Sequence, residues 1–209
     1  MQILVVVATD FELNAVKKYL TNLANVDFAV TGVGMLPTAY ALTRLLAQKK
    51  YEWVFNVGIA GTFSAEILLG EAVVIACETV AESGIENTEG TVESFPKNLQ
   101  IDADLRCPYI NDFSFLQNVK KVNGLTVNLL TENAERVVQR KLLADVETME
   151  GAAFFYVCVK ENVKFLQLRG ISNRVGERDK AQWKTQEALE NVANLLAYCH
   201  SALDAESPD

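Results

Sequence analysis

The chain has 209 residues, of which 50% are hydrophobic and 22% are charged, so it can bury the core of one large α/β domain. A net charge of −8 and a pI near 4.8 argue against a nucleic-acid partner and against an anionic membrane surface. Asp10 and Glu12 follow the apolar start of the chain too closely for a signal peptide or a membrane span. We therefore expect a cytoplasmic protein that binds a small molecule.

The cysteine and histidine content limits the possible chemistry. The four cysteines share no close spacing, and the single histidine, His200, lies near the C-terminus. No zinc set is present, so we expect free thiols, no metal and no cofactor. Mechanisms of the Ser-His-Asp or Cys-His type are also excluded, which leaves general acid and base work to carboxylates.

The first half of the chain alternates between strand and helix patterns. A β-branched run at its start predicts a buried central strand, and Pro37 suits the first position of a helix because it lacks an N–H. The expected strands of this half are 2–8, 26–31, 53–57 and 71–79, and the expected helices are 10–20 and 37–48. An acidic, glycine-containing segment at 82–95 predicts a long loop or hairpin.

The second half continues the alternation after an ambiguous stretch at 104–116, for which we expect a short helix near Asp112. The expected elements that follow are a strand at 122–130, a helix at 132–143, a helix after Glu150, a strand at 164–171 and an amphipathic helix at 183–203. Residues 204–209 are expected to be a frayed acidic tail. The pattern predicts a single three-layer α/β/α domain over 1–203, around a mixed, largely parallel twisted sheet.

The segment 145–176 carries two polar clusters. An apolar segment leads to Glu147 and Glu150 at the start of an expected helix, and Ser172 and Asn173 follow the next expected strand about 23 residues later. A strand-helix-strand unit would place both clusters on one rim of the sheet, where open α/β sheets bind ligands.

Two carboxylates are candidates for catalysis. Glu12 lies one helical turn beyond the first strand, so its side chain can point over the rim; a solvated helix residue beside Asp10 is the alternative. Glu150 lies among small residues that allow a ligand to come close, with capping of the helix as the alternative.

Two glycine pairs, Gly32/Gly34 and Gly58/Gly61, each follow an expected strand, where backbone N–H groups can meet a polar ligand. The first pair does not make a dinucleotide-binding fingerprint, because Pro37 stands where the third glycine is needed. Tight turns explain either pair equally well, just as capping of a turn explains Asn173.

Taken together, ILVVVATDFE, the GVG and GIAG turns, AESGIE, GLTVN, VETMEGAA and RGISNRVGERD resemble the nucleoside phosphorylase and nucleosidase superfamily over nearly the whole chain. Within it, the motifs are most similar to the futalosine hydrolase branch. The resemblance implies hydrolysis of an N-ribosidic bond, releasing hypoxanthine and dehypoxanthine futalosine in menaquinone biosynthesis.

The resemblance also implies roles for individual residues. Glu12 becomes the base that orients and deprotonates water, and Glu150 accepts hydrogen bonds from the ribose hydroxyls near the oxocarbenium-like sugar. Arg169 and Ser172 would help to place the water and Glu12. The substrate-binding positions that it implies are Met149, Gly58, Ala60, Gly61, Arg169 and Ser172.

Asn173 departs from the adenine-cleaving relatives, methylthioadenosine/S-adenosylhomocysteine nucleosidases, which carry aspartic acid at this position. An amide can donate to a 6-keto oxygen while it accepts from N7–H, a pattern that matches hypoxanthine and mismatches adenine. Asn173 cannot supply a proton, so N7 would gain its proton from water.

Phosphorolysis is the rival chemistry, and it needs a cationic phosphate cradle. The cations before Arg44 are Lys17 and Lys18 on the first helix, and Glu12 would repel a phosphate dianion. We therefore expect water to be the nucleophile. Thr131 is a candidate beside the base and Trp183 a candidate wall. For a carboxylate on the 5′ group, the possible counter-charges are Arg174, Arg178 and Lys180, with solvated loop charges as the alternative.

Two other functions stay open at this stage. One is a nucleosidase or phosphorylase that acts on methylthioadenosine, S-adenosylhomocysteine or inosine-like nucleosides. The other is a purine-nucleoside binding protein without turnover, against which the pair Glu12 and Glu150 argues, because binding alone needs no water-activating carboxylate. The resemblance further implies a homodimer or a larger homo-oligomer.

Overall fold

The structure is a computed structural model that describes residues 1–19, 25–88, 92–93, 95–96, 100–101, 103–177 and 179–206. It has an α/β fold around one mixed seven-stranded sheet. The strands of this sheet are β1 (Ile3–Val7), β2 (Val26–Val30), β3 (Trp53–Thr62), β4 (Ala72–Val80), β7 (Lys121–Thr126), β8 (Val146–Thr148) and β9 (Lys164–Arg174).

The sheet closes on itself. Its strand order is β2-β1-β3-β8-β7-β4-β9, and β9 pairs with β3 as well as with β4. Strands β3, β8, β7, β4 and β9 therefore form a ring, from which β1 and β2 extend. The pairings β3–β8 and β4–β9 are antiparallel, whereas β1–β2, β1–β3, β3–β9, β4–β7 and β7–β8 are parallel.

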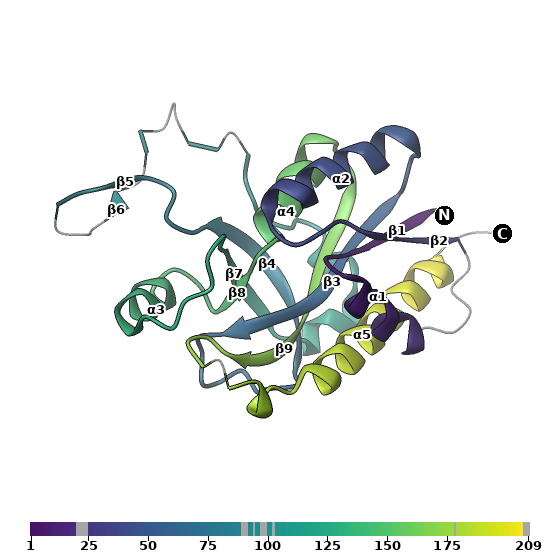
Figure 1. The fold of residues 1–209 in the computed structure, drawn as a ribbon. Helices are drawn as coiled ribbons and strands as arrows, with labels where there is room; N and C mark the ends of the chain where they lie inside the picture. Colours follow the sequence, from purple (N-terminus) through teal and green to yellow (C-terminus); the bar gives the residue numbers. More distant parts are fainter. Residues whose placement is uncertain are drawn as a thin grey trace.

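Helices cover the sheet in pairs. Helix α2 (Met35–Gln48) contacts α4 (Gly151–Lys160), and α1 (Asp10–Tyr19) contacts α5 (Thr185–Glu206). In Figure 1 the first pair lies above the sheet and the second pair below and to the right, while α3 (Ala134–Lys141) lies apart near β7 and β8. Among the described residues, none of the helices is both long and apolar enough to cross a membrane.

The core follows from the apolar runs of the sequence. All five residues of β1 are buried, as expected for a strand with neighbours on both sides. The side chains of Phe154 and Phe155 on α4 pack edge-on against Phe165 of β9, with ring centroids 5.7 and 4.9 Å apart. This cluster fixes the start of α4 against the ring of strands.

Two strands are longer than expected, and both carry site residues. The strand predicted at 53–57 continues to Thr62, and the strand predicted at 164–171 continues to Arg174, because the two strands keep pairing with each other beyond those points. Gly58 and Gly61 therefore lie within β3 rather than in a turn, and Ser172 and Asn173 lie within β9 rather than after it.

Other boundaries differ as well. The stretch 145–150 contains the unexpected strand β8, whereas β7 ends at Thr126, four residues before the predicted end. Helix α3 begins only at Ala134, since the side chain of Asn133 caps it by accepting from the N–H of Arg136. Helix α5 runs from Thr185 to Glu206, so Asp204–Glu206 are helical, and 207–209 lie outside the described residues.

The segments expected to be irregular contain short elements. Strands β5 (Ile85–Glu86) and β6 (Val92–Glu93) form a hairpin within 82–95, and in Figure 1 it projects from the body. The short helix expected near Asp112 is present as a 3₁₀ turn, η2 (Ile110–Asp112), which is followed by η3 (Ser114–Asn118). A further 3₁₀ turn, η4 (Lys180–Gln182), precedes α5.

Candidate functional site

A cavity of about 390 Å³ opens where β1, β3, β8 and β9 end. It brings together most of the residues that the sequence singled out: Glu12, Glu150, Asn173, Met149, Ala60, Gly61 and Ser172. Two expected residues, Gly58 and Arg169, are not among the residues that line it; they lie directly behind the two carboxylates.

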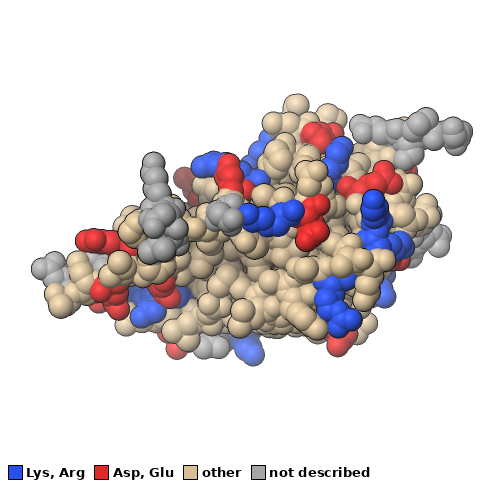
Figure 2. All heavy atoms as spheres, turned by 90° about the horizontal axis from the view of Figure 1, so that it is seen from above, with Lys and Arg blue, Asp and Glu red and all other residues tan. Residues whose placement is uncertain are grey.

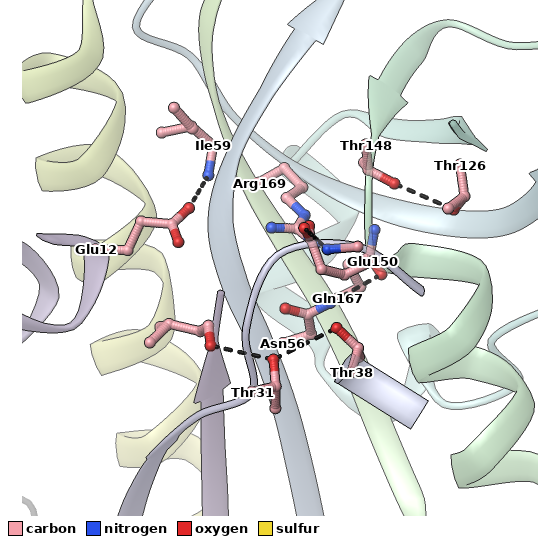
Figure 3. A network of polar contacts seen from close by, with 12 residues as sticks. Glu12, Thr31, Thr38, Asn56, Ile59, Thr126, Thr148, Glu150, Gln167 and Arg169 are labelled. Atoms are coloured by element: carbon pink, nitrogen blue, oxygen red, sulfur yellow. Dashed lines mark hydrogen bonds and ion pairs between the residues drawn. The ribbon is translucent and has the colours of Figure 1, made fainter. Parts of the chain in front are cut away.

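Glu12 is buried, and its carboxylate accepts three hydrogen bonds. Its Oε2 accepts from the backbone N–H of Thr9 at 3.1 Å and from the Thr9 hydroxyl at 3.0 Å, while its own N–H donates to that hydroxyl. This reciprocal arrangement is a capping box at the start of α1. Its Oε1 accepts from the N–H of Ile59 on β3 at 3.2 Å (Figure 3). The carboxylate is therefore fixed between a helix end and a strand.

Gly58 makes this position possible. A Cβ atom at residue 58 would lie 2.6 Å from Oε1 of Glu12 and 2.4 Å from Nη1 of Arg169. Such distances are far below van der Waals contact, so a side chain here would displace both groups. Gly58 is thus required by close approach inside a strand, not by a turn.

Glu150 precedes α4 and is equally buried. Its Oε1 accepts from the N–H of Gly34 at 3.0 Å, and its Oε2 lies 3.4 Å from Nη2 of Arg169. In Figure 3, Glu12 and Glu150 approach from opposite sides of β3, with Arg169 on the Glu150 side. The first glycine turn, expected to meet a ligand, instead holds a carboxylate of the protein.

Arg169 is almost fully buried, at 1% exposure, on β9. Its Nε is a buried polar atom without a hydrogen-bond partner among the described residues. An unmade hydrogen bond of this kind costs about 1–3 kcal/mol, and the charge is offset in part by Glu150. The site therefore keeps a guanidinium beside Glu150 at a cost to stability.

Asn173 points its amide into the cavity from β9. Its Oδ1 accepts from the hydroxyl of Ser172 at 2.8 Å, and its Nδ2 donates to the carbonyl of Arg174 at 2.9 Å. This orients the amide, and it leaves one N–H of Nδ2 and one lone pair of Oδ1 for a ligand.

Glu147 also lines the cavity, in keeping with its expected place in a polar cluster on the rim, although the sequence suggested no individual role for it. Its Oε2 accepts from Nη1 of Arg140 at 2.8 Å, and Arg140 also binds Glu82 and the carbonyl of Leu129. Burial raises the pKa of the Glu147 carboxyl, and the charge of Arg140 counters part of that effect. The pairing of β8 with β3, which a local pattern does not reveal, brings this residue to the cavity.

A further buried carboxyl group, that of Glu78, lies behind the site on β4. It accepts hydrogen bonds from Thr126, Thr148 and Gln167 at 2.7–3.2 Å. Burial raises the pKa of Glu78 to about 7, an effect that these hydrogen bonds reduce. Because Thr126 also accepts from the N–H of Ala152, the cluster anchors the first turn of α4 next to Glu150.

The cavity is acidic. The carboxylates among its lining residues are Glu12, Glu147, Glu150 and Glu177, and none of the described residues that line it is a lysine or an arginine. A phosphate dianion would meet net negative charge there. The described residues contain no group of three or more potential metal ligands.

Of the expected counter-charges for a 5′ carboxylate, Arg174 and Lys180 do not line the cavity. Arg174 donates to the carbonyl of Ser64, Lys180 is exposed on η4, and Arg178 lies outside the described residues. Trp183 does line the cavity, and its Nε1 donates to the carbonyl of Glu177; Thr131 lines it as well. On the face shown in Figure 2, positive and negative side chains are interspersed rather than gathered by sign.

Several residues that line the cavity were not predicted from the sequence. Among them, Thr9 had a recognisable signal, because Thr9-Asp10-Phe11-Glu12 is the S/T-x-x-E pattern of a capping box. Phe11 on α1, Val33 in the turn after β2 and Thr148 at the end of β8 carried no such signal.

Comparison with known proteins places the chain among nucleoside-processing enzymes. Residues 14–204 match the family model of the phosphorylase superfamily. The chain is 34% identical to a futalosine hydrolase of Thermus thermophilus over 178 residues, which cover 79% of this chain and 77% of that protein. It is 25% identical to a 5′-methylthioadenosine/S-adenosylhomocysteine nucleosidase of a Marinomonas species, over 90% of this chain and 94% of that one.

Solved structures have the same fold. A futalosine hydrolase of Helicobacter pylori superposes with a TM-score of 0.79, covering 98% of each chain at 15% sequence identity. At that identity the likeness shows the fold alone.

Proposed function

Because this chain belongs to the phosphorylase superfamily, we propose that it hydrolyses the N-ribosidic bond of futalosine and releases hypoxanthine and dehypoxanthine futalosine, a step of menaquinone biosynthesis. One observation carries the proposal: Glu12, Glu150 and Asn173 line a single acidic cavity. None of the described residues that line this cavity is a lysine or an arginine. The names of several similar proteins support the choice of substrate.

Glu12 is the proposed general base. Its carboxylate is held by Thr9 and by the N–H of Ile59, so little reorganisation is needed when it accepts a proton from water. The water oxygen bonds to C1′ of the ribose as the bond from C1′ to N9 breaks. The electron pair of that bond passes to the departing purine, which takes a proton from water.

Glu150 is the proposed partner of the ribose. An oxocarbenium-like transition state carries positive charge on the sugar ring, and a nearby carboxylate stabilises it more than it stabilises the neutral ground state. Gly34 and Arg169 fix the direction of Glu150, and Met149 lines the cavity next to it as the proposed packing surface for the sugar.

Asn173 is the proposed contact of the base. Ser172 donates to its Oδ1, which supports an orientation in which Nδ2 faces a 6-keto oxygen and the second lone pair of Oδ1 faces N7–H. Hydrolysis is better supported than phosphorolysis, because Glu12 and the other carboxylates that line the cavity would repel phosphate.

Cleavage of methylthioadenosine or S-adenosylhomocysteine is the second candidate, since nucleosidases of that specificity match most of the chain. The two functions are separated by incubating the protein with futalosine, inosine and methylthioadenosine and identifying the released base by chromatography. The proposal expects hypoxanthine from futalosine and little adenine from methylthioadenosine. Release of adenine alone would support the second candidate and refute the first.

Several properties of the whole protein are proposed on the same basis. Free cysteines in the described part of the chain support a cytoplasmic location. The helix pairs α1–α5 and α2–α4 and the five parallel pairings support the three-layer, largely parallel description. Large exposed apolar side chains on α2, Leu36 and Tyr40, support a homodimer or larger homo-oligomer, which sedimentation analysis would test.

A further inference from the structure

Glu147, Gly61 and Asn173 form a row across three neighbouring strands. Gly61 of β3 pairs with Glu147 of β8 on one side and with Asn173 of β9 on the other. Residues opposite one another in a sheet project on the same face, and both side chains line the cavity. Gly61 lacks a side chain, so a slot lies between the carboxylate and the amide, with the strand as its floor.

The slot has the dimensions of a base edge. Neighbouring strands lie about 4.8 Å apart, so the two outer Cα atoms are separated by roughly 10 Å. Two hydrogen bonds of about 2.9 Å, one from each side chain to a flat ring, fit within that span. A Cβ at Gly61 would meet Val175 at 3.0 Å and Nδ2 of Asn173 at 3.2 Å, so a side chain there would close the slot.

Arg140 holds the Glu147 carboxylate ready to accept a hydrogen bond. The guanidinium is 2% exposed and donates to Oε2, while none of the described residues donates to Oε1. Arg140 also binds the carbonyl of Leu129, next to Leu130 and Thr131 on the cavity wall. Carboxylate and wall are thereby fixed together by one buried cation.

We propose that Glu147 is a specificity-determining residue, whose Oε1 accepts a hydrogen bond from N1–H of a 6-oxopurine. The inference rests on the proposed function and extends it from one residue that contacts the purine to two. Around the edge of hypoxanthine, the groups N7, O6 and N1–H follow in that order; Asn173 meets the first two and Glu147 meets the third. Adenine carries an unprotonated N1, whose lone pair the carboxylate repels.

The test compares Glu147→Gln with the wild type on futalosine-type and adenosine-type nucleosides. Glutamine keeps the size of the side chain, loses the charge-assisted bond and can turn its NH₂ toward N1 of adenine. We expect the ratio of the two kcat/KM values to fall by about 10- to 100-fold. An equal loss for both substrates would mean that Glu147 supports the structure only, and an unchanged ratio would also overturn the inference.

Glu82→Gln is the matched control. It removes the other carboxylate from Arg140, yet Glu82 is not among the residues that line the cavity. The inference expects this variant to keep the wild-type ratio. A fall of the same size in Glu82→Gln would show that the effect arises from Arg140 rather than from Glu147, and would contradict the inference.

A measurement on the wild-type protein tests the inference even if the Glu147→Gln variant does not fold. Hypoxanthine labelled with ¹⁵N at N1 should show, when bound, a downfield N1–H signal that exchanges slowly with water. Fast exchange at N1 in the bound base would overturn the inference.

Failure of the proposed function has a separate signature. If the wild type releases no base from any nucleoside, that function is wrong, and direct binding of hypoxanthine and adenine then decides the inference. A preference for hypoxanthine that Glu147→Gln removes supports it. Absence of that preference, or of any hypoxanthine binding, refutes it.

Discussion

At the scale of single residues, Glu12 combines a structural and a chemical part. Its Oε2 completes the capping box with Thr9, which explains why a carboxylate is stable at the start of α1. Its Oε1 reaches across to the N–H of Ile59, which a capping box does not require. This second contact turns the carboxylate toward the cavity.

Glu12→Gln should separate the two parts. The amide oxygen can still accept from the N–H of Thr9, but its NH₂ then faces the N–H of Ile59 and leaves that donor unpaired, so we expect a loss of about 1–3 kcal/mol in stability, and the amide cannot take a proton from water. We expect kcat to fall by about 10²- to 10⁴-fold with a small change in KM. Steady-state kinetics together with thermal unfolding measure this, and a kcat within threefold of the wild type would contradict the role of Glu12.

Asn173→Asp tests whether the side chain at this position determines which purine base is preferred. An aspartate can donate to N7 when protonated and accept from a 6-amino group, so preference should shift from inosine-type toward adenosine-type nucleosides, by roughly 10-fold or more. Paired kcat/KM values on the two substrate types give the result. If base preference is the same in both proteins, the amide does not choose the base.

The site residues that could be predicted from the sequence are those that belong to recognisable short motifs. Glu12 and Glu150 stand in a recognisable order of short motifs, so their meeting in one cavity was expected. Glu147 and Arg140 were not assigned, because their contact depends on the register between β8 and β3 and on the position of α3. Arg140 and Glu147 are seven residues apart, but the turn between α3 and β8 that brings them together has no recognisable local pattern.

At the scale of elements, the packing of α5 on β9 depends on one glycine. A Cβ at Gly170 would lie 2.1 Å from the carbonyl oxygen and 3.0 Å from the Cα of Ala188 on α5. The neighbours are backbone atoms, which cannot turn aside. Helix α5 must therefore lie against the strand that carries Arg169 and Asn173.

Gly170→Ala should lower the free energy of unfolding by about 1–3 kcal/mol, because the helix must shift away from the strand. Urea unfolding measures the change. Glu190→Ala, an exposed change on the same helix, serves as control and should stay within about 0.5 kcal/mol of the wild type. Equal midpoints for all three proteins would show that the contact is not tight.

Element boundaries reveal what local patterns miss. Helices α1 and α2 follow clear apolar periodicity, and their positions agree with the prediction to within two residues. Strand β8 has only three residues, and the ends of β3 and β9 carry glycine and polar residues that resemble turn signals. Their strand conformation comes from pairing partners far away in the sequence.

At the scale of the whole molecule, buried Glu78 makes stability depend on pH. Folded Glu78 keeps its proton up to a pKa of about 7, whereas the unfolded chain releases it near 4.5. Between these values the folded state binds more protons, so stability from this group is present below pH 4.5 and is lost as pH rises through 7. The loss amounts to about 3 kcal/mol.

Glu78→Gln should remove that dependence, since an amide does not titrate. Urea titrations at a series of pH values from 4 to 8 measure the unfolding free energy of both proteins. As pH increases, the unfolding free energy of the wild type should fall relative to that of the variant. Parallel curves for the two proteins would mean that Glu78 has an ordinary pKa in the folded state.

The closed sheet, the acidic cavity and the oriented amide together support the claim that water cleaves futalosine in this cavity. The most direct measurement follows hypoxanthine and the sugar product when the purified protein acts on futalosine, with and without inorganic phosphate. We predict equal rates in both buffers, with one hypoxanthine and one unphosphorylated dehypoxanthine futalosine formed per futalosine consumed. Product that appears only with phosphate, as a sugar phosphate, or no hypoxanthine in either buffer, would contradict the claim.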